Sequence, residues 1–324
     1  MKMKSKTLVP GVSKPVSELV LGTSWYSLKD QDRLFSLMDE FVASGGTALD
    51  TARCYGESEN VIGLWMEARA NRDRIAIITK GGLSEKDPTT LAVEGLRAKV
   101  EKDITRSLDC LRTDHIDLYF LHRDAPAIPV SEIVECLNAE SARGRIRAFG
   151  GSNWETSRVD EANEYADKHG LVPFAAVSNN LSLAVPTGPF YPGLVTTDDK
   201  AKRWHAKTGI PLFAWASLAR GFFTGRFRPE IRSDPARLRD SFTANMMRIY
   251  CTEDNLQRLR RAEELGKAKG NFSAVQMALA WVLHQPFTAL PLVGMHSNEE
   301  VASSLAALSI RLSEAEVKWL NLET

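Results

Sequence analysis

The chain has 324 residues, of which 44% are hydrophobic and 25% are charged, as in an ordinary globular protein. Its 41 Lys and Arg side chains equal its 41 Asp and Glu side chains, so no bulk positive charge points to nucleic acid or an acidic membrane. The basic start runs into Pro10 and Gly11 instead of an apolar signal core, and the longest strongly apolar helix candidate, 277–283, is too short to span a bilayer. We therefore expect a cytoplasmic protein that binds neither nucleic acid nor membrane.

The four cysteines, Cys54, Cys110, Cys136 and Cys251, are scattered and include no Cys-x-x-Cys pair. Their spacing indicates neither a disulfide framework nor a zinc site. The six histidines show no metal-ligand spacing, and the His-Glu-x-x-His pattern is absent. We expect no metal. Cys54 adjoins Tyr55 and could line a pocket, although the role of a small buried hydrophobic residue is favoured.

Short apolar runs alternate with amphipathic stretches along the chain. After an N-terminal segment expected to form a small hairpin, strands are expected at 19–21, 47–49, 75–79, 116–121, 147–150, 174–178, 211–215 and 288–293. Helices are expected at 31–43, 57–70, 91–110, 131–142, 156–168, 198–207, 253–269, 273–285 and 298–307, with a short terminal helix after Ser313. Ser273 with Gln276, and Ser313 with Glu316, form capping-box patterns.

Eight strand–helix units in sequence favour a (β/α)₈ TIM barrel, with a short N-terminal hairpin and extra C-terminal helices. An open dinucleotide-binding sheet would carry a Gly-x-Gly-x-x-Gly turn after its first strand, and the chain has neither this turn nor a P-loop. The prediction is one domain over residues 1–324. Its longest interruption, 217–250, is rich in Arg, Gly and Phe, and a loop of that length in a compact domain is usually functional.

Asp50, Tyr55, Lys80 and His122 each lie just past the end of a short apolar run. Because the carboxyl ends of parallel strands meet at one rim of a barrel, these four side chains are expected to converge there. A carboxylate, a phenol, an amine and an imidazole in one place form a proton-transfer set. The pattern indicates an enzyme.

The segments that carry these residues resemble those of the aldo-keto reductase superfamily. The resemblance rests on 46–56 followed by 57–63, on 78–80 and on 117–122, in order and with family-like spacing, and it runs from about Leu19 to the final helix. It implies a (β/α)₈ barrel and a nicotinamide cofactor. It also implies reduction of an aldehyde, ketone or sugar-like carbonyl, or oxidation of the corresponding alcohol.

The residue types suit that chemistry. A phenol with a pKa of about 10 is a weak acid near neutrality, and a nearby ammonium lowers that pKa. We therefore assign Tyr55 as the general acid, Lys80 as the group that tunes it and Asp50 as the group that holds Lys80. His122, the fourth member of the family's tetrad, would donate a hydrogen bond to the carbonyl. Taken singly, each residue is more often structural, but jointly the catalytic reading is favoured.

The resemblance also implies contacts to the nicotinamide. Ser152 and Asn153 fall where the family holds the carboxamide, although they could equally cap the next helix. Ser178 stands where the family commonly has glutamine, so Asn179 or Asn180 could replace that contact. Trp215 falls on the aromatic residue that stacks on the nicotinamide ring.

The remaining cofactor positions follow the seventh and eighth expected strands. The segment 217–250 is expected to cover the cofactor, and Ser217, Leu218, Gly221 and Arg226 fall in its pyrophosphate loop. Gly294, His296, Ser297, Glu300 and Ser304 fall where the family recognises adenosine. His296 stands where an arginine is expected and Glu300 adds a carboxylate. NADP(H) is preferred by the resemblance, and NAD(H) is the open alternative.

The substrate walls are expected from loops that carry Trp25, Tyr26, Arg53, Arg123 and Trp154. The two arginines favour a polar or anionic substrate, although solvated ion pairs explain them equally well. No pattern indicates an oligomeric state. Two other functions remain open: a cofactor-binding regulatory subunit, as in the potassium-channel β subunits of the same fold, and a barrel hydrolase with a metal on Asp50 and His122.

Overall fold

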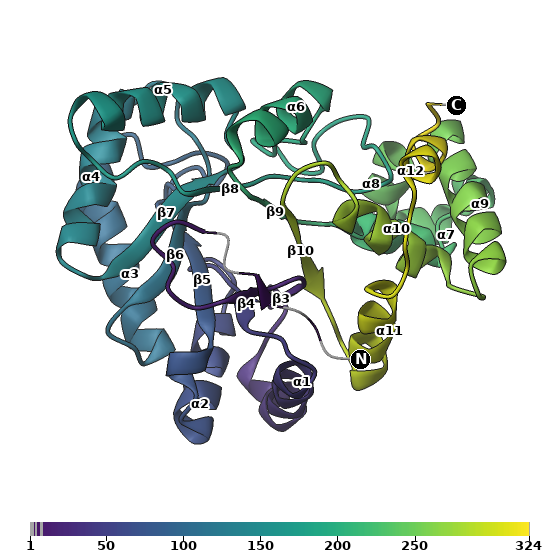
Figure 1. The fold of residues 1–324 in the computed structure, drawn as a ribbon, viewed down its shortest axis with the longest axis horizontal. Helices are drawn as coiled ribbons and strands as arrows, with labels where there is room; N and C mark the ends of the chain where they lie inside the picture. The colour runs from purple at the N-terminus through teal and green to yellow at the C-terminus, as the bar shows by residue number, and fades with distance from the viewer. Residues whose placement is uncertain (1–2, 4, 7–8, 324) are drawn as a thin grey trace.

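A computed structural model describes residues 3, 5–6 and 9–323 of the chain (Figure 1). Eight parallel strands close into a barrel in the order β10-β3-β4-β5-β6-β7-β8-β9, which confirms the predicted (β/α)₈ architecture. The strands are β3 (Val20–Gly22), β4 (Ala48–Asp50), β5 (Ala76–Gly81), β6 (Ile116–Leu121), β7 (Ile146–Ser152), β8 (Ala176–Ser178), β9 (Leu212–Ala214) and β10 (Ala289–Gly294). Each overlaps a predicted strand.

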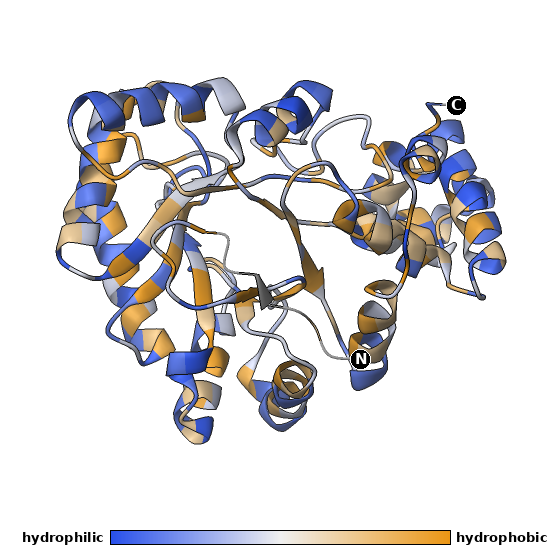
Figure 2. Ribbon diagram, in the orientation of Figure 1, coloured by the Kyte–Doolittle hydropathy of each residue, from blue (hydrophilic) through white to orange (hydrophobic). Residues whose placement is uncertain are grey.

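The helices lie outside the barrel. They are α1 (Gln31–Ala43), α2 (Ser58–Arg69), α3 (Leu96–Leu111), α4 (Val130–Ala142), α5 (Thr156–Lys168), α6 (Asp199–Thr208), α9 (Glu253–Ala268), α10 (Ala274–Leu283), α11 (Asn298–Ala307) and α12 (Glu314–Leu320). Figure 2 shows their apolar faces turned toward the strands and their polar faces turned outward. Both predicted capping boxes are present, at the starts of α10 and α12.

Two predicted features, the start of one helix and the nature of one long segment, differ most from the structure. Helix α3 begins at Leu96 and not at position 91, because Gly95 adopts a left-handed conformation (φ 69°) and Leu91 pairs with Leu83 in an isolated bridge. The segment 217–250 is not a plain loop. It contains the 3-10 helices η3 (Ala219–Thr224) and η4 (Pro229–Ser233) and the helices α7 (Pro235–Leu238) and α8 (Ser241–Ile249).

The N-terminal segment closes one end of the barrel. Its strands β1 (Ser5–Lys6) and β2 (Val16–Ser17) pair antiparallel, as the predicted hairpin requires, while the connecting residues 7–8 lie outside the described residues. Val9 and Val12 pack in the same cluster as strand residues of the barrel interior. Lys14 Nζ lies 2.9 Å from Asp117 Oδ1 near the start of β6. The open end is therefore the one formed by the carboxyl ends of the strands.

Candidate active site

A cavity of about 650 Å³ lies at the carboxyl end of the barrel. Gly22, Asp50, Ser152 and Gly294, which line it, are the last residues of their strands. Lys80, Tyr55 and His122 line the same cavity. The structure therefore brings together the four residues that the sequence singled out for proton transfer.

Lys80 and Asp50 form a buried ion pair across strands β4 and β5. Lys80 Nζ donates to Asp50 Oδ1 at 2.5 Å and to the Thr51 carbonyl oxygen at 2.9 Å, and the two residues are only 2% and 3% exposed. Burial lowers the pKa of Lys80, but the attractions of Asp50 and Tyr55 outweigh it and leave that pKa above its usual value. Lys80 is therefore a fixed ammonium at the bottom of the cavity.

Tyr55 lies between Lys80 and His122. Lys80 Nζ is 5.4 Å from the centroid of the Tyr55 ring, and the Tyr55 and His122 rings meet edge to face with centroids 5.8 Å apart. Burial raises the pKa of Tyr55, and Lys80 lowers it by less, so the net shift is upward. Lys80 therefore acts on this pKa in the predicted direction, but desolvation of the phenolate outweighs its effect.

His122 is a neutral imidazole whose Nδ1 faces a thiol. Burial, reinforced by the positive charges of Lys80 and Arg123, holds the pKa of His122 well below its usual value. Cys54 Sγ lies 3.5 Å from Nδ1, and burial raises the pKa of this thiol. The S–H donates to Nδ1 in the tautomer that carries the ring proton on Nε2, and Sγ accepts from Nδ1–H in the other tautomer. Cys54 is exposed to the cavity and is not the buried residue that the sequence favoured.

Ser152 and Asn153 line the cavity beside His122. Ser152 Oγ donates to the Ser178 carbonyl oxygen at 2.9 Å, and the Asn153 amide donates to the His122 carbonyl oxygen at 3.2 Å. Helix α5 begins after Glu155 and has no side-chain cap, so these residues do not cap the next helix. They face the cavity from positions fixed by the barrel.

The last residue of β8 and the two residues after it differ in their freedom to bind a ligand. The Asn179 amide exchanges hydrogen bonds with the backbone of Trp154, and Asn180 donates to the Trp215 carbonyl oxygen. The buried Ser178 hydroxyl has no side-chain hydrogen-bond partner among the described residues. Ser178 is therefore better placed than its two neighbours to accept a new partner.

The backbone after β9 is strained. Ala216, Ala219 and Arg220 all have positive φ, between 47° and 54°, which residues other than glycine rarely adopt. Gly221 continues the left-handed run at φ 83° and lies against the Arg226 guanidinium. Ser217 Oγ donates to the Leu292 carbonyl oxygen, and this hydrogen bond stabilises the loop. Leu218 and Arg226 stay partly or fully exposed.

The segment after β10 meets helix α1. The His296 ring stacks on Trp25, with centroids 4.1 Å apart, and Arg33 Nη1 donates to the His296 carbonyl oxygen at 2.7 Å. Glu300 accepts from the backbone N–H of His296 at 2.7 Å, and Ser297 caps α11. Ser304 is buried farther along α11. Arg33 is a cation that the sequence reading missed at this place, because only the β10–β3 pairing brings residue 33 beside residue 296.

The expected substrate walls are only partly in place. Arg123 lines the central cavity. Tyr26 is 3% exposed and belongs to the hydrophobic core, and Trp154 is fully buried, with its indole N–H donating to the Arg123 carbonyl oxygen. Trp25 packs against His296 instead of lining the cavity. None of these three aromatic residues is among the described residues that line the central cavity, and packing buries Tyr26 and Trp154.

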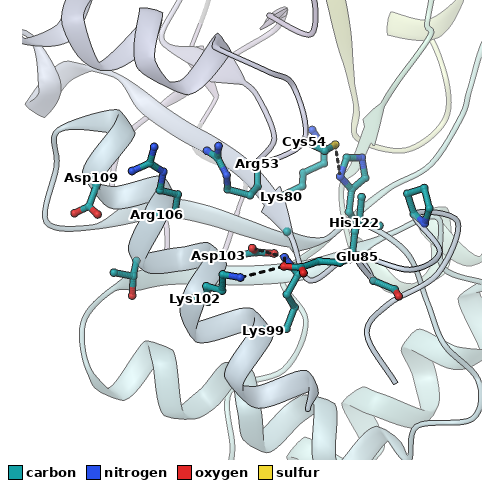
Figure 3. Close-up of a pocket in the computed structure, with 15 residues that line it drawn as sticks. Arg53, Cys54, Lys80, Glu85, Lys99, Lys102, Asp103, Arg106, Asp109 and His122 are labelled. Atoms are coloured by element: carbon teal, nitrogen blue, oxygen red, sulfur yellow. Dashed lines mark hydrogen bonds and ion pairs between the residues drawn. The ribbon is translucent and has the colours of Figure 1, made fainter. Parts of the chain in front are cut away.

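Arg53 lines a second cavity, of about 720 Å³, between helix α3 and the loop that precedes it (Figure 3). Its guanidinium pairs with Glu59. Cys54, Lys80 and His122 line both cavities, so the second cavity adjoins the first at the proposed reaction centre. Arg53 is therefore near the site but outside its central chamber.

Three features in and beside the central cavity suit a nicotinamide dinucleotide. The half-buried Trp215 offers an aromatic face, and its indole N–H is buried without a partner among the described residues. The Ser178 hydroxyl is likewise free. The left-handed turn around Gly221 leaves its cation, Arg226, without a carboxylate partner in the described chain, as a phosphate site requires.

The sequence model of the Aldo/keto reductase family matches residues 18–321. The chain belongs to this family. Norsolorinic acid reductase B of Dothistroma septosporum is 31% identical over 98% of the chain and 80% of its own length. Aryl-alcohol dehydrogenase [NADP(+)] of Phanerodontia chrysosporium is 26% identical over 98% of the chain and 85% of its own length.

The fold agrees with that of a solved family member. The thermostable aldo-keto reductase Tm1743, in complex with the inhibitor epalrestat, superposes with a TM-score of 0.72 at 22% identity, covering 99% of this chain and 100% of that one. Membership of the aldo/keto reductases makes this protein an oxidoreductase, and the family uses nicotinamide cofactors.

Among residues 3, 5–6 and 9–323, no three His, Cys, Asp or Glu side chains gather so that they could hold a metal ion. No helix in this part of the chain combines the length and the hydrophobicity that a membrane crossing needs. In this aldo/keto reductase Asp50 Oδ1 pairs with Lys80, and His122 contacts Cys54 through Nδ1.

The raised pKa of Tyr55 predicts that its phenol stays protonated well into the alkaline range. A group with a raised pKa holds its proton to higher pH, so Tyr55 should ionise at a higher pH than a free phenol, whose pKa is about 10. Ultraviolet absorbance titration of the wild-type protein and of Tyr55→Phe measures this directly. A tyrosinate signal that appears near neutrality and is missing from Tyr55→Phe would contradict it.

Proposed function

We propose that this protein reduces aromatic aldehydes or ketones with NADP(H), with Tyr55 as the general acid. The observation that carries the proposal is the convergence of Tyr55, the Lys80–Asp50 pair and His122 on one cavity that Trp215 also lines. A carboxylate, an ammonium, a phenol and a neutral imidazole around one chamber suit delivery of a proton to a carbonyl oxygen.

Each side chain has a separate task. A bound reduced nicotinamide supplies the hydride, and Ser152, Asn153 and Trp215 would hold its ring. His122 donates from Nε2 to the substrate oxygen and so orients and polarises the carbonyl. Tyr55 then transfers its proton to that oxygen as negative charge develops there.

Lys80 acts through Tyr55. Its ammonium favours the phenolate that Tyr55 becomes, while Asp50 holds the ammonium in place. In the direction of alcohol oxidation the phenolate takes the proton back. Because Lys80 and Asp50 are almost fully buried, little water shields their charges from the reacting groups.

The aromatic substrate class follows from the walls of the cavity. Tyr191, Pro192 and Leu194 form one side, and Leu83 and Pro88 another. Flat and apolar walls favour a planar ring. Names of similar proteins, an aryl-alcohol dehydrogenase and a norsolorinic acid reductase, agree with such a substrate.

NADP(H) is proposed over NAD(H) because the guanidinium of Arg33 in α1 lies beside the segment after β10. Arg33 and His296 lie together and could face a phosphate on the adenosine ribose. Glu300 opposes this phosphate, but its carboxylate is turned to the backbone N–H of His296. NADP⁺ also appears in the name of one similar protein.

Changing Tyr55 to Phe removes only the proton donor. We predict that Tyr55→Phe binds NADPH as the wild type does and loses about 10²–10⁴-fold in kcat for benzaldehyde reduction. Steady-state kinetics, with cofactor binding followed by Trp fluorescence, measure both properties. Turnover close to that of the wild type would refute the assignment of Tyr55.

Changing Glu300 to Arg replaces a repulsion by an attraction at the proposed phosphate site. We predict that Glu300→Arg shifts the ratio of NADPH to NADH affinities toward NADPH by about five- to tenfold at low salt. Glu264→Arg, an equal change of charge on the exposed face of α9, should leave the ratio unchanged. An unaltered ratio in Glu300→Arg would show that the phosphate site lies elsewhere.

A further inference from the structure

The central cavity carries more positive than negative charge. Lys80, Arg123 and Arg220 line it, whereas Asp50 is its only carboxylate among the described lining residues. Asp50 and Lys80 neutralise each other. No carboxylate of the described chain pairs with Arg123 or Arg220, so two guanidinium groups remain unbalanced at the cavity wall.

Arg220 is held by aromatic rings and not by hydrogen bonds. Its guanidinium carbon lies 4.4 Å from the centroid of Phe190, 5.8 Å from that of Tyr191 and 5.9 Å from that of Trp215. Its Nε is buried without a partner in the described chain. Rings on the faces of a guanidinium fix its plane but leave its N–H donors in that plane free. Arg220 is therefore positioned to bind a planar anion.

Arg220 also has an unusual backbone. Its φ is 54°, in the left-handed region, and it follows Ala219 in the same region. A strained conformation in a residue other than glycine persists only where the surroundings enforce it, and such residues cluster at functional sites. Here the conformation places the side chain between the segment after β8 and Trp215, over the cavity.

Arg123 approaches from a different strand. It follows His122 at the end of β6, and its Nη1 donates to the His122 carbonyl oxygen at 2.8 Å. Its Nε is buried without a partner among the described residues. Burial lowers the pKa of Arg123, which shows that the guanidinium is partly desolvated, and a desolvated cation gains more from an anionic ligand.

We infer that the substrate is an aromatic carbonyl compound bearing an anionic group, a carboxylate or an acidic phenolate, that Arg123 and Arg220 bind. This inference rests on the proposed function and adds the charge of the substrate to it. The phosphates of the dinucleotide are the competing ligand for Arg220. They are assigned to the Gly221–Arg226 turn, because Arg226 does not line the reaction cavity and Arg220 does.

The test compares 4-formylbenzoate with its methyl ester, which replaces the carboxylate at the far end of the ring by an uncharged group. The wild type should reduce the anion with the higher kcat/KM. Arg220→Gln, and Arg123→Gln as a second variant from another strand, should each lower kcat/KM for the anion by about tenfold or more. In each variant the ester should lose a smaller factor of kcat/KM than the anion, because the ester lacks the charge that the guanidinium groups bind. Arg237→Gln, an exposed arginine of α7, is the matched control and should change neither.

The outcomes separate this inference from the proposed function. Equal losses for acid and ester in both arginine variants would overturn it, as would a wild type that prefers the ester. NADPH binding that weakens about tenfold in Arg220→Gln, measured by Trp fluorescence, would reassign Arg220 to the cofactor phosphates and also overturn it. If the wild type reduces neither compound, the proposed function itself fails, and the inference fails with it.

Discussion

The candidate site is organised around one buried cation. Lys80 is held by Asp50 and by the Thr51 carbonyl oxygen, and its charge acts on both groups proposed to touch the substrate. It lowers the pKa of Tyr55 against the effect of burial, and it adds to the burial that keeps His122 neutral. A single ammonium therefore favours proton release from the phenol and secures an uncharged hydrogen-bond donor beside it. Without its partner, a buried charge of this kind costs about 3–5 kcal/mol.

Closure of the barrel positions the residues of the site that lie outside the tetrad. Because β10 pairs with β3, helix α1 and the segment before α11 become neighbours, and Arg33 reaches His296. The segment after β8 and the strained turn after β9 meet through Arg220, whose guanidinium contacts rings from both. The rigid strands position the tetrad, while ligand selection is left to these connecting segments.

The sequence was sufficient for the parts of the structure that depend on local pattern. Apolar runs located all eight strands, and residues at their carboxyl ends pointed to Asp50, Lys80 and His122 because parallel strands share one rim. Capping boxes marked the starts of α10 and α12 correctly. Tyr55 follows the same apolar run as Asp50, and the resemblance to aldo-keto reductases added the family's tetrad and the expected cofactor.

The sequence did not predict contacts between segments that lie far apart in the chain. Tyr26 and Trp154 looked like wall residues in the sequence, yet three-dimensional packing buries them. The roles suggested for Arg33 and Arg220 depend on neighbours far away in the chain. The direction of the Tyr55 pKa shift depends on how far burial outweighs Lys80, which no sequence motif encodes.

The most direct test is a single-turnover measurement of hydride transfer from bound NADPH to benzaldehyde in wild type and Lys80→Met. Lys207→Met, on the exposed surface of α6, serves as a control, and Asp50→Asn/Lys80→Met controls for the unpaired carboxylate. If Lys80 tunes the proton donor, both variants that lack it should transfer hydride about 10²–10⁴-fold more slowly while NADPH still binds. Transfer within about threefold of the wild type in a folded, NADPH-bound Lys80→Met protein would contradict the account.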